Sequence, residues 1–214
     1  MERDKVLDII KERIVYLDYE PGKQLREKEL REEFDIGRTP LREIFIKLEG
    51  EGLITTVPHS GTYVSTVSFH ELRDLFEVRS YLISLAGKLA ARRINEGELE
   101  ELSGLVDEMR AEKDPKELMK LDCRAHELVN ESTGNTVLVE NLRKLRQQSV
   151  RIWVFPRTKK FMGTFAEEFS ELNEALSDGD EKKSGRILAS HMEDFIDEIK
   201  NQFISAGQRE ETIE

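Results

Sequence analysis

The sequence contains one cysteine, one tryptophan, five prolines and no long apolar run in its 214 residues. The single cysteine, Cys123, cannot form an intrachain disulfide, which is typical of a reducing compartment. The longest apolar stretches, such as 152–155, are far shorter than the ~20 residues that a membrane span needs. The first residues are charged and lack the apolar core of a signal peptide. We therefore expect a cytoplasmic protein without membrane contact.

An excess of positive charge is also absent, because the formal net charge is −11. This balance argues against a protein that coats nucleic acid through bulk charge. Residues 1–66 carry 11 Lys and Arg against 14 Asp and Glu, so the N-terminal part is not basic either. Seven basic residues nevertheless fall between Lys23 and Lys47, and folding can gather them on one surface. Any contact with nucleic acid must therefore be local.

The length and composition predict two folded domains. A chain of 214 residues can bury two cores, and 38% hydrophobic with 36% charged residues is typical of a soluble, mostly helical protein. No strand pattern follows Val67, and no internal repeat is visible. We place the domains at 1–67 and 68–205, followed by a polar tail over 206–214.

The first domain is predicted to contain three helices. Apolar residues repeat at helical spacing over 6–17, and Leu25 begins a second, shorter apolar pattern over 25–34. A break at Gly37 leads into a third helix that opens with Pro40, since proline is tolerated in a first turn. The second and third helices, joined by a short turn, are therefore expected to form a helix-turn-helix motif.

A β-hairpin is predicted directly after the third helix. The segments 53–57 and 62–65 have strand composition, and Pro58-His59-Ser60-Gly61 supplies the turn between them. A β-hairpin that directly follows a helix-turn-helix is typical of the wing in a winged helix-turn-helix domain. The first domain is therefore expected to be a winged helix-turn-helix with three helices and a small β-hairpin.

Helix start signals recur through the rest of the chain. They are Ser68 with Glu71, Asn95 with Glu98, Asp114 before Pro115, Asn135 and Asp180. The first of these helices should run to about Arg92. The predicted fold class is mainly α, with the winged helix-turn-helix followed by an antiparallel bundle of six or seven helices.

The third helix carries the residues best suited to reading DNA. Arg38 and Arg42 are four residues apart on one helical face, where forked guanidinium groups can grip guanine or phosphate. Thr39 can donate to phosphate, and the helix N-terminus adds backbone N–H groups and a positive dipole end. The alternative is that the arginines form ion pairs with Glu43 or Glu49.

These residues resemble the winged helix-turn-helix of GntR regulators over about 6–67. The resemblance is carried by Pro21-Gly22, Leu25, Glu29-Leu30, Gly37-Arg38-Thr39-Pro40-Leu41-Arg42-Glu43, Leu48 and Glu51-Gly52-Leu53-Ile54. It implies a transcription regulator that binds a palindromic operator in double-stranded DNA as a homodimer. We expect a repressor, because repressors are commoner than activators. Gly37 departs from the family, which commonly has serine or threonine there.

The resemblance also implies which residues contact the operator. They are Lys28, Arg38, Thr39 and Arg42, with His59 and Gly61 of the wing near the minor groove. Lys28 and His59 fit an ordinary solvated surface as well. Gly61 is needed for the turn in either case.

A second set of residues resembles the ligand-binding FCD domain of FadR-type GntR regulators, over about 68–203. It comprises Glu77-Val78-Arg79, Asp122 with His126, Thr133-Gly134-Asn135, Ala175-Leu176 with Gly179-Asp180, and His191. Asp122 and His126 are spaced i, i+4, so one helical face presents both to one ion. The resemblance implies a divalent metal, Zn, Ni or Mn, that these two residues and His191 hold beneath a small carboxylate effector.

One metal ligand of the family pattern is missing, because Phe169 occupies the position of its remaining histidine. Two outcomes stay open: a three-ligand site completed by water or effector, or a cavity without metal. Arg79, on the first helix of the bundle, can grip an organic acid bidentately. An ion pair with Glu77 or another acid is its alternative.

Two other classes of protein compete with a regulator. A metal held by the Asp and His residues could activate water in an enzyme, but the chain has no nucleophile elbow, phosphate-binding glycine loop, dinucleotide fingerprint or cysteine-rich metal motif. A protein-interaction adaptor would suit the negative charge, although not the run from Arg38 to Arg42. We therefore expect a regulator that is not an enzyme, with an operator affinity that an effector changes.

Overall fold

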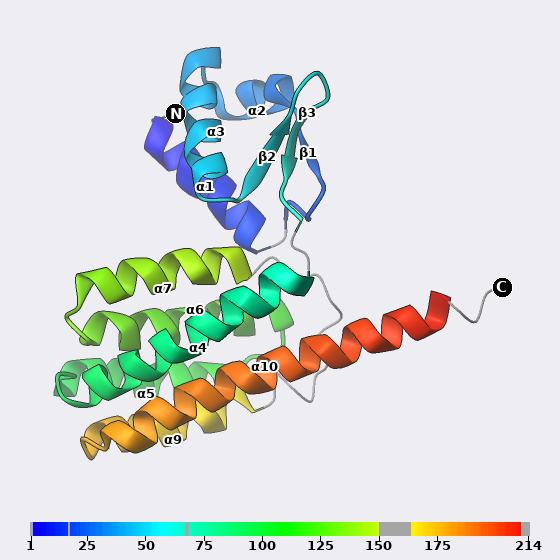
Figure 1. The fold of residues 1–214 in the computed structure, drawn as a ribbon. Coiled ribbons are helices and arrows are strands. Elements are labelled where there is room, and N and C mark those ends of the chain that lie inside the picture. Colours follow the sequence, from blue (N-terminus) through cyan, green and yellow to red (C-terminus); the bar gives the residue numbers. More distant parts are fainter. Residues whose placement is uncertain (1, 17, 67–68, 150–163, 211–214) are drawn as a thin grey trace. The chain divides into compact units, whose positions relative to one another are not determined.

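The computed structural model describes residues 2–16, 18–66, 69–149 and 164–210 (Figure 1). The chain divides into two compact units. The first comprises Met1–Leu72 with Lys144–Val154, and the second Arg73–Arg143 with Phe155–Glu214. Among the helices of the described residues, none combines the length and the apolar character of a membrane span.

Three helices and a small sheet form the N-terminal unit. The helices are α1 (Arg3–Val15), α2 (Glu27–Phe34) and α3 (Arg38–Gly50), and the strands are β1 (Gln24–Leu25), β2 (Ile54–Val57) and β3 (Gly61–Val64). The core between them buries, among others, Val6, Ile10, Ile14, Leu41, Ile44, Leu48 and Leu53 completely. Because α1, α2 and β2 all pack against α3, the predicted recognition helix is held on several sides.

The sheet differs from the predicted hairpin by one strand. Its order is β1-β3-β2, all antiparallel, and Leu25 lies opposite Thr62 of β3. Leu25 was expected in the second helix, but that helix begins only at Glu27. A two-residue strand is too short to show a period, so the buried leucine alone could not distinguish the two assignments.

The wing turns through residues with positive φ. His59 has φ 62 and Gly61 has φ 134. A side chain at Gly61 would also place its Cβ 2.6 Å from the Nε2 atom of Gln24. Gln24 is a flexible side chain that can move aside, so it is the backbone conformation that requires glycine at the start of β3.

Six helices follow the wing in the described residues. They are α4 (Phe69–Ala91), α5 (Glu96–Ala111), α6 (Pro115–Ser132), α7 (Thr136–Ser149), α9 (Phe165–Ser177) and α10 (Glu181–Glu210). α5 packs against α6 and α9, and α9 packs against α10. The prediction of a mainly α protein with a winged helix-turn-helix and a helical bundle is confirmed.

The predicted helix starts are confirmed wherever the structure describes them. Asn95 and Glu98 form a reciprocal capping box, and Asp114 accepts hydrogen bonds from the first amides of α6. The side chains of Asn135 and Asp180 accept hydrogen bonds from the backbone N–H of the third residue after each. Ser68 lies outside the described residues. Local capping chemistry thus places most helices of this unit.

Two glycines let α4 and α10 touch backbone to backbone. A methyl group added at Gly87 would lie 2.7 Å from the carbonyl oxygen of Ser184. One added at Gly185 would lie 2.8 Å from the carbonyl oxygen of Ser84. This close approach lies near the start of α10, the helix that also carries His191.

Candidate functional site

The N-terminus of α3 presents an uncapped helix end. Gly37 is the N-cap residue and offers no side chain to the first turn. The amides of that turn therefore remain available to an anion, and the helix dipole adds partial positive charge. A phosphate group is the natural ligand for such an end in a chain that places arginines beside it.

Arg38, Thr39 and Arg42 are exposed on the first turns of α3. The acids that could have paired with the arginines are bound elsewhere: Glu43 accepts a hydrogen bond from Arg3 at 2.8 Å, and Glu49 accepts one from the amide of Thr56 at 2.8 Å. Within the described parts of the chain, no acid lies at ion-pair distance from Arg38 or Arg42. The two guanidinium groups are therefore presented to solvent together.

The other predicted operator contacts come from different elements of the same unit. Lys28 lies on α2, with a side chain that is 86% exposed and an ammonium group 4.0 Å from Glu32. His59 lies in the wing turn, and Gly61 is the first residue of β3. α3 thus supplies three of the six predicted contact residues, and α2 and the wing supply the rest.

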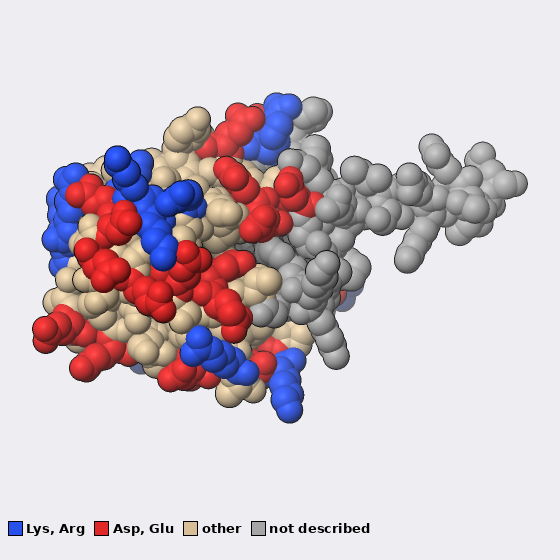
Figure 2. Space-filling view, turned by 90° about the horizontal axis from the view of Figure 1, so that it is seen from below, with Lys and Arg blue, Asp and Glu red and all other residues tan. Residues whose placement is uncertain are grey.

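Acidic side chains are abundant on one face of the molecule. Figure 2 shows acidic side chains spread across the face seen from below, with lysines and arginines in smaller groups. This agrees with the net charge of −11. Because the whole molecule is negatively charged, any attraction to DNA phosphates has to come from exposed arginines close to the contact.

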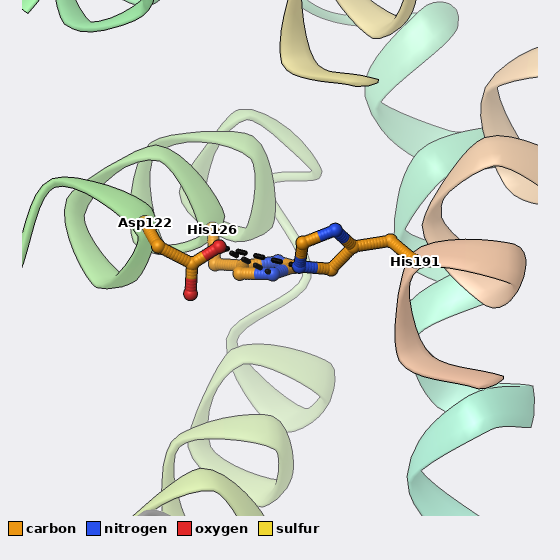
Figure 3. A group of neighbouring side chains, drawn as sticks. All are labelled: Asp122, His126 and His191. Atoms are coloured by element: carbon orange, nitrogen blue, oxygen red, sulfur yellow. Dashed lines mark ion pairs between the residues drawn. The ribbon is translucent and has the colours of Figure 1, made fainter. Parts of the chain in front are cut away.

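The second site lies inside the helical unit, where Asp122, His126 and His191 converge (Figure 3). α6 supplies the first two residues one turn apart, and α10 supplies the third. The Oδ1 atom of Asp122 lies 3.2 Å from Nε2 of His191 and 3.7 Å from Nε2 of His126. All three residues are buried, with exposed fractions of 2 to 6%. The structure thus brings together all three predicted metal ligands.

A fourth polar residue, Glu168 of α9, was missed from the sequence. Its carboxylate accepts a hydrogen bond from Nδ1 of His191, on the opposite side of the ring from Asp122. Burial lowers the pKa of His191, but the hydrogen bonds to Asp122 and Glu168 raise it more, to about 9. Without a metal, His191 is therefore a cation between two carboxylates at neutral pH.

Arg79 of α4 belongs to the same electrostatic environment. It is only 6% exposed. Burial raises the pKa of Asp122, but the charges of His126, His191 and Arg79 outweigh burial, and the net shift of that pKa is downward. Asp122 is therefore ionised, as a metal ligand must be.

Phe169 forms an apolar wall beside the two histidines. Its side chain is 2% exposed, and its ring centroid lies 5.2 Å from that of His126 and 5.6 Å from that of His191. A residue at this position is therefore a neighbour of both rings. Phenylalanine offers no lone pair there, so it cannot be a ligand.

The donor set itself fits a divalent metal. Ligands about 2.1 Å from one ion lie roughly 3.0 to 3.5 Å apart from each other. The two separations from Asp122, 3.2 and 3.7 Å, lie in or near this range, and the three ligand atoms are all within 4.8 Å of one another, so the side chains would have to approach further to share one ion. The Glu168 contact would then orient His191 from its second nitrogen, as carboxylates do behind metal-bound histidines.

A surface pocket opens beside this buried group. It has a volume of about 380 Å³ and lies between α9 and α10, with Glu168, Lys183, Arg186 and His191 among its lining residues. Glu168 and His191 therefore face both the pocket and the buried cluster. Of the three predicted metal ligands, His191 lines this pocket.

The two sites define a class of protein: a DNA-binding regulator with an exposed recognition helix and a helical domain that contains a buried polar site. Residues 74–194, more than half of the chain, match the model of the FCD domain, and residues 2–64 match that of the bacterial regulatory proteins of the gntR family. The chain therefore belongs to the GntR family of bacterial regulators with an FCD domain, and it is a transcriptional regulator.

Individual relatives agree with this assignment. The chain is 26% identical over 185 residues to the Nta operon transcriptional regulator of Aminobacter aminovorans, covering 85% of this chain and 86% of the relative. It is 28% identical over 151 residues to the HTH-type transcriptional repressor RspR of Escherichia coli (strain K12), covering 69% and 66%. The structure of E. coli McbR/YncC has the same fold, with a TM-score of 0.84 at 19% identity over 94% of this chain and 98% of that one.

Proposed function

We propose that the protein is a FadR-subfamily repressor that binds a palindromic operator as a homodimer and responds to a small carboxylate held with a divalent metal. The observation that carries this proposal is the buried group of Asp122, His126 and His191 with metal-like donor spacing. A buried cluster of this kind has no role in DNA contact. It therefore favours a sensing function for the helical domain, as the RspR name favours repression.

Each side chain has a distinct role in the proposed sensor. Asp122, His126 and His191 hold the metal, Zn, Ni or Mn, which supplies a Lewis-acidic position for one carboxylate oxygen. Arg79 offers a second, bidentate grip on the same acid. Glu168 holds His191 in the orientation that points Nε2 at the metal. The domain acts by binding and not by catalysis.

One further polar group on α6 suits this site. Asn130 lies one turn beyond His126, is 4% exposed, and its Oδ1 atom has no hydrogen-bond partner in the described part of the chain. Buried amide oxygens are rarely left unsatisfied. A hydroxyl or ammonium group on the effector, or a water bound with it, would satisfy this one.

The proposal assigns the two activities to separate domains. Residues 1–67 bind the operator, with Lys28, Arg38, Thr39 and Arg42 on the DNA and His59 and Gly61 at the minor groove. Residues 68–205 bind the effector and form the dimer, and 206–214 form a polar tail whose first residues continue α10. A regulator of this kind works in the cytoplasm, where its operator lies.

Operator binding and metal content test the proposal together. We would select operator sequences from a random DNA library, measure binding by fluorescence anisotropy at several salt concentrations, and repeat it with divalent metals and small carboxylic acids. A metal bound one per chain by the wild type and absent from His126→Ala is the expected result. His59→Ala, a histidine in the wing, is the matched control and should retain the metal.

Two outcomes would contradict specific parts of the proposal. Operator affinity that stays constant under every metal and acid would overturn the sensing function. Protein without metal under all conditions, but stabilised by acids, would remove the metal and leave Arg79 as the anchor.

A further inference from the structure

One isoleucine of α3 lies on the outside of the helix. Ile46 is 70% exposed, whereas its apolar neighbours Ile44, Phe45 and Leu48 are between 0 and 6% exposed. A single exposed apolar side chain is common on protein surfaces, so the exposure alone indicates no contact. The side of α3 on which Ile46 lies decides what it can meet.

Ile46 lies on the same side of α3 as two of the proposed DNA-contact residues. At 3.6 residues per turn, its side chain projects about 40° from that of Arg42 and about 20° from that of Thr39. The core residues Leu41 and Leu48 project about 140° and about 160° away from it. Thr39, Arg42 and Ile46 are all exposed, and both leucines are buried. Ile46 therefore belongs to the surface that would meet DNA.

Polar contacts on both flanks fix how α3 presents this surface. Glu43 and Glu49 project about 60° to either side of Ile46. Glu43 binds Arg3 at the start of α1 at 2.8 Å, and Glu49 accepts a hydrogen bond from a backbone amide of β2 at 2.8 Å. The fold thus holds the side chains on both flanks and leaves the isoleucine between them uncovered.

We propose that Ile46 reads a thymine of the operator through the C5-methyl group of that base. An isoleucine side chain can form no hydrogen bond, so it can select a base only by apolar contact. In the major groove thymine offers such a contact, because its methyl group is displayed there. This inference rests on the proposed function, since it requires that α3 binds in the major groove of an operator. It adds a base-specific contact, and the base that is selected, to those of the arginines.

The spacing of Ile46 and Arg42 places this thymine relative to the arginine contact. Four residues of helix rise about 6 Å, and successive bases of one strand are about 3.4 Å apart along the DNA axis. If α3 lies along the groove, the thymine is therefore within about two base pairs of the base or phosphate that Arg42 binds. We expect a thymine at this distance in each half-site.

The surroundings of Ile46 favour DNA over a partner protein. Its neighbours on this side of the helix are polar or basic, with Arg38, Thr39 and Arg42 in the preceding turns. In the described part of the N-terminal domain, the other large apolar side chain that is exposed is Val57, which lies on β2. One isoleucine contributes little to a protein interface of about 1,000 Å². Contact with one base methyl group needs no larger apolar surface.

Replacing thymine by deoxyuridine removes only the C5-methyl group and so tests the contact directly. In the operator selected by the wild-type chain, each thymine of one half-site is replaced in turn, and binding is measured by fluorescence anisotropy. At one position we expect the Kd of the wild type to rise about threefold, because one methyl contact is lost. Ile46→Ala should bind the thymine and the uracil operator with equal affinity.

Two further variants control for side-chain size and for position. Ile46→Val keeps a β-branched apolar side chain and should retain the preference for thymine over uracil. Val57→Ala removes an exposed apolar side chain from the wing and should show the same uracil penalty as the wild type, because the minor groove displays no thymine methyl group. Ile46→Ala should remain folded, since the side chain is 70% exposed and alanine favours a helix. Thermal denaturation checks the fold of each variant.

The outcomes separate this contact from the proposed function. If no replacement of thymine by uracil changes the operator affinity of the wild type, or if Ile46→Ala shows the same uracil penalty, the contact is overturned although the operator is bound. A chain that selects no operator from the library overturns the contact and the proposed function together. A methyl-dependent operator affinity that no metal or acid changes would support the contact and overturn the proposed sensing.

Discussion

The proposed DNA-reading surface and the buried Asp-His-His group differ in how the chain builds them. On α3, Arg38 and Arg42 are neighbours in sequence, exposed, and free of ion pairs in the described chain. Asp122 and His191 come from helices far apart in sequence and are buried with Phe169 between α6, α9 and α10. The exposed surface can therefore change without cost to the fold, whereas the buried site cannot change without altering helix packing.

This difference has a functional consequence. A surface of exposed, flexible arginines can be altered to read another operator by single substitutions. A ligand that binds the buried group acts on residues from two or three helices at once. In the proposed function, recognition is thus local, and sensing is a property of the bundle.

The strongest test of the exposed surface is the double variant Arg38→Ala/Arg42→Ala. We expect operator affinity to fall by about 100-fold or more, since each bidentate base contact contributes about 1–3 kcal/mol. The free energy of unfolding should change by less than about 0.5 kcal/mol, because both side chains are exposed. Fluorescence anisotropy and urea denaturation measure the two quantities. Arg124→Ala, an exposed arginine on α6, is the control; an equal loss of affinity there would mean that charge alone matters.

The metal-binding role of the buried site is best tested by adding the fourth ligand that it lacks. Phe169→His should raise metal affinity by about 10- to 100-fold, because the ring is a neighbour of both histidines and supplies a fourth ligand. Phe169→Leu keeps the site apolar and should leave the affinity as it is. Competition with a chromogenic chelator gives both values. Equal affinities for the two variants would show that position 169 does not face the metal.

Glu168→Gln tests the carboxylate behind His191. An amide orients the ring more weakly and removes the negative charge, so metal affinity should decrease by about tenfold. Glu171→Gln on the same helix, whose carboxylate binds Lys183 at 3.2 Å, is the matched control. The chelator competition applies again, and identical losses for the two variants would contradict a specific role for Glu168.

The smallest expected effect is at Gly37, the uncapped start of α3. Its φ of −73 suits any residue, and an added Cβ would meet only Pro40, at 3.5 Å. Gly37→Ser should stabilise the domain by a few tenths of a kcal/mol through an N-cap hydrogen bond. It should also strengthen operator binding slightly if the hydroxyl reaches phosphate. Thermal denaturation and anisotropy measure these effects, and a loss of stability would rule out the cap.

The sequence predicted those features that depend on local chemistry. Caps such as Asn95 and Asp114, the apolar periods of the helices and the turn at Gly61 each act within a few residues, so their outcome is readable from the chain. The metal ligands were predicted through the family resemblance, and the i, i+4 spacing of Asp122 and His126 supported them.

Features that depend on packing were not predictable in the same way. Strand β1 exists because Leu25 meets β3, thirty-odd residues later, and two residues carry no periodic signal. Glu168 gains its role only when α9 packs against α10, and no spacing pattern connects it to His191. The exposure of Ile46 likewise depends on which sides of α3 the neighbouring elements cover.

The crossing of α4 and α10 at Gly87 and Gly185 gives the helical domain a rigid mechanical link. Because a carbonyl oxygen of each helix lies against a glycine of the other, the two backbones have no room to approach more closely at this point. His191 lies only two turns beyond this contact on α10. A displacement of α10 near His191 therefore cannot carry this part of α10 closer to α4 without overlap of the two backbones.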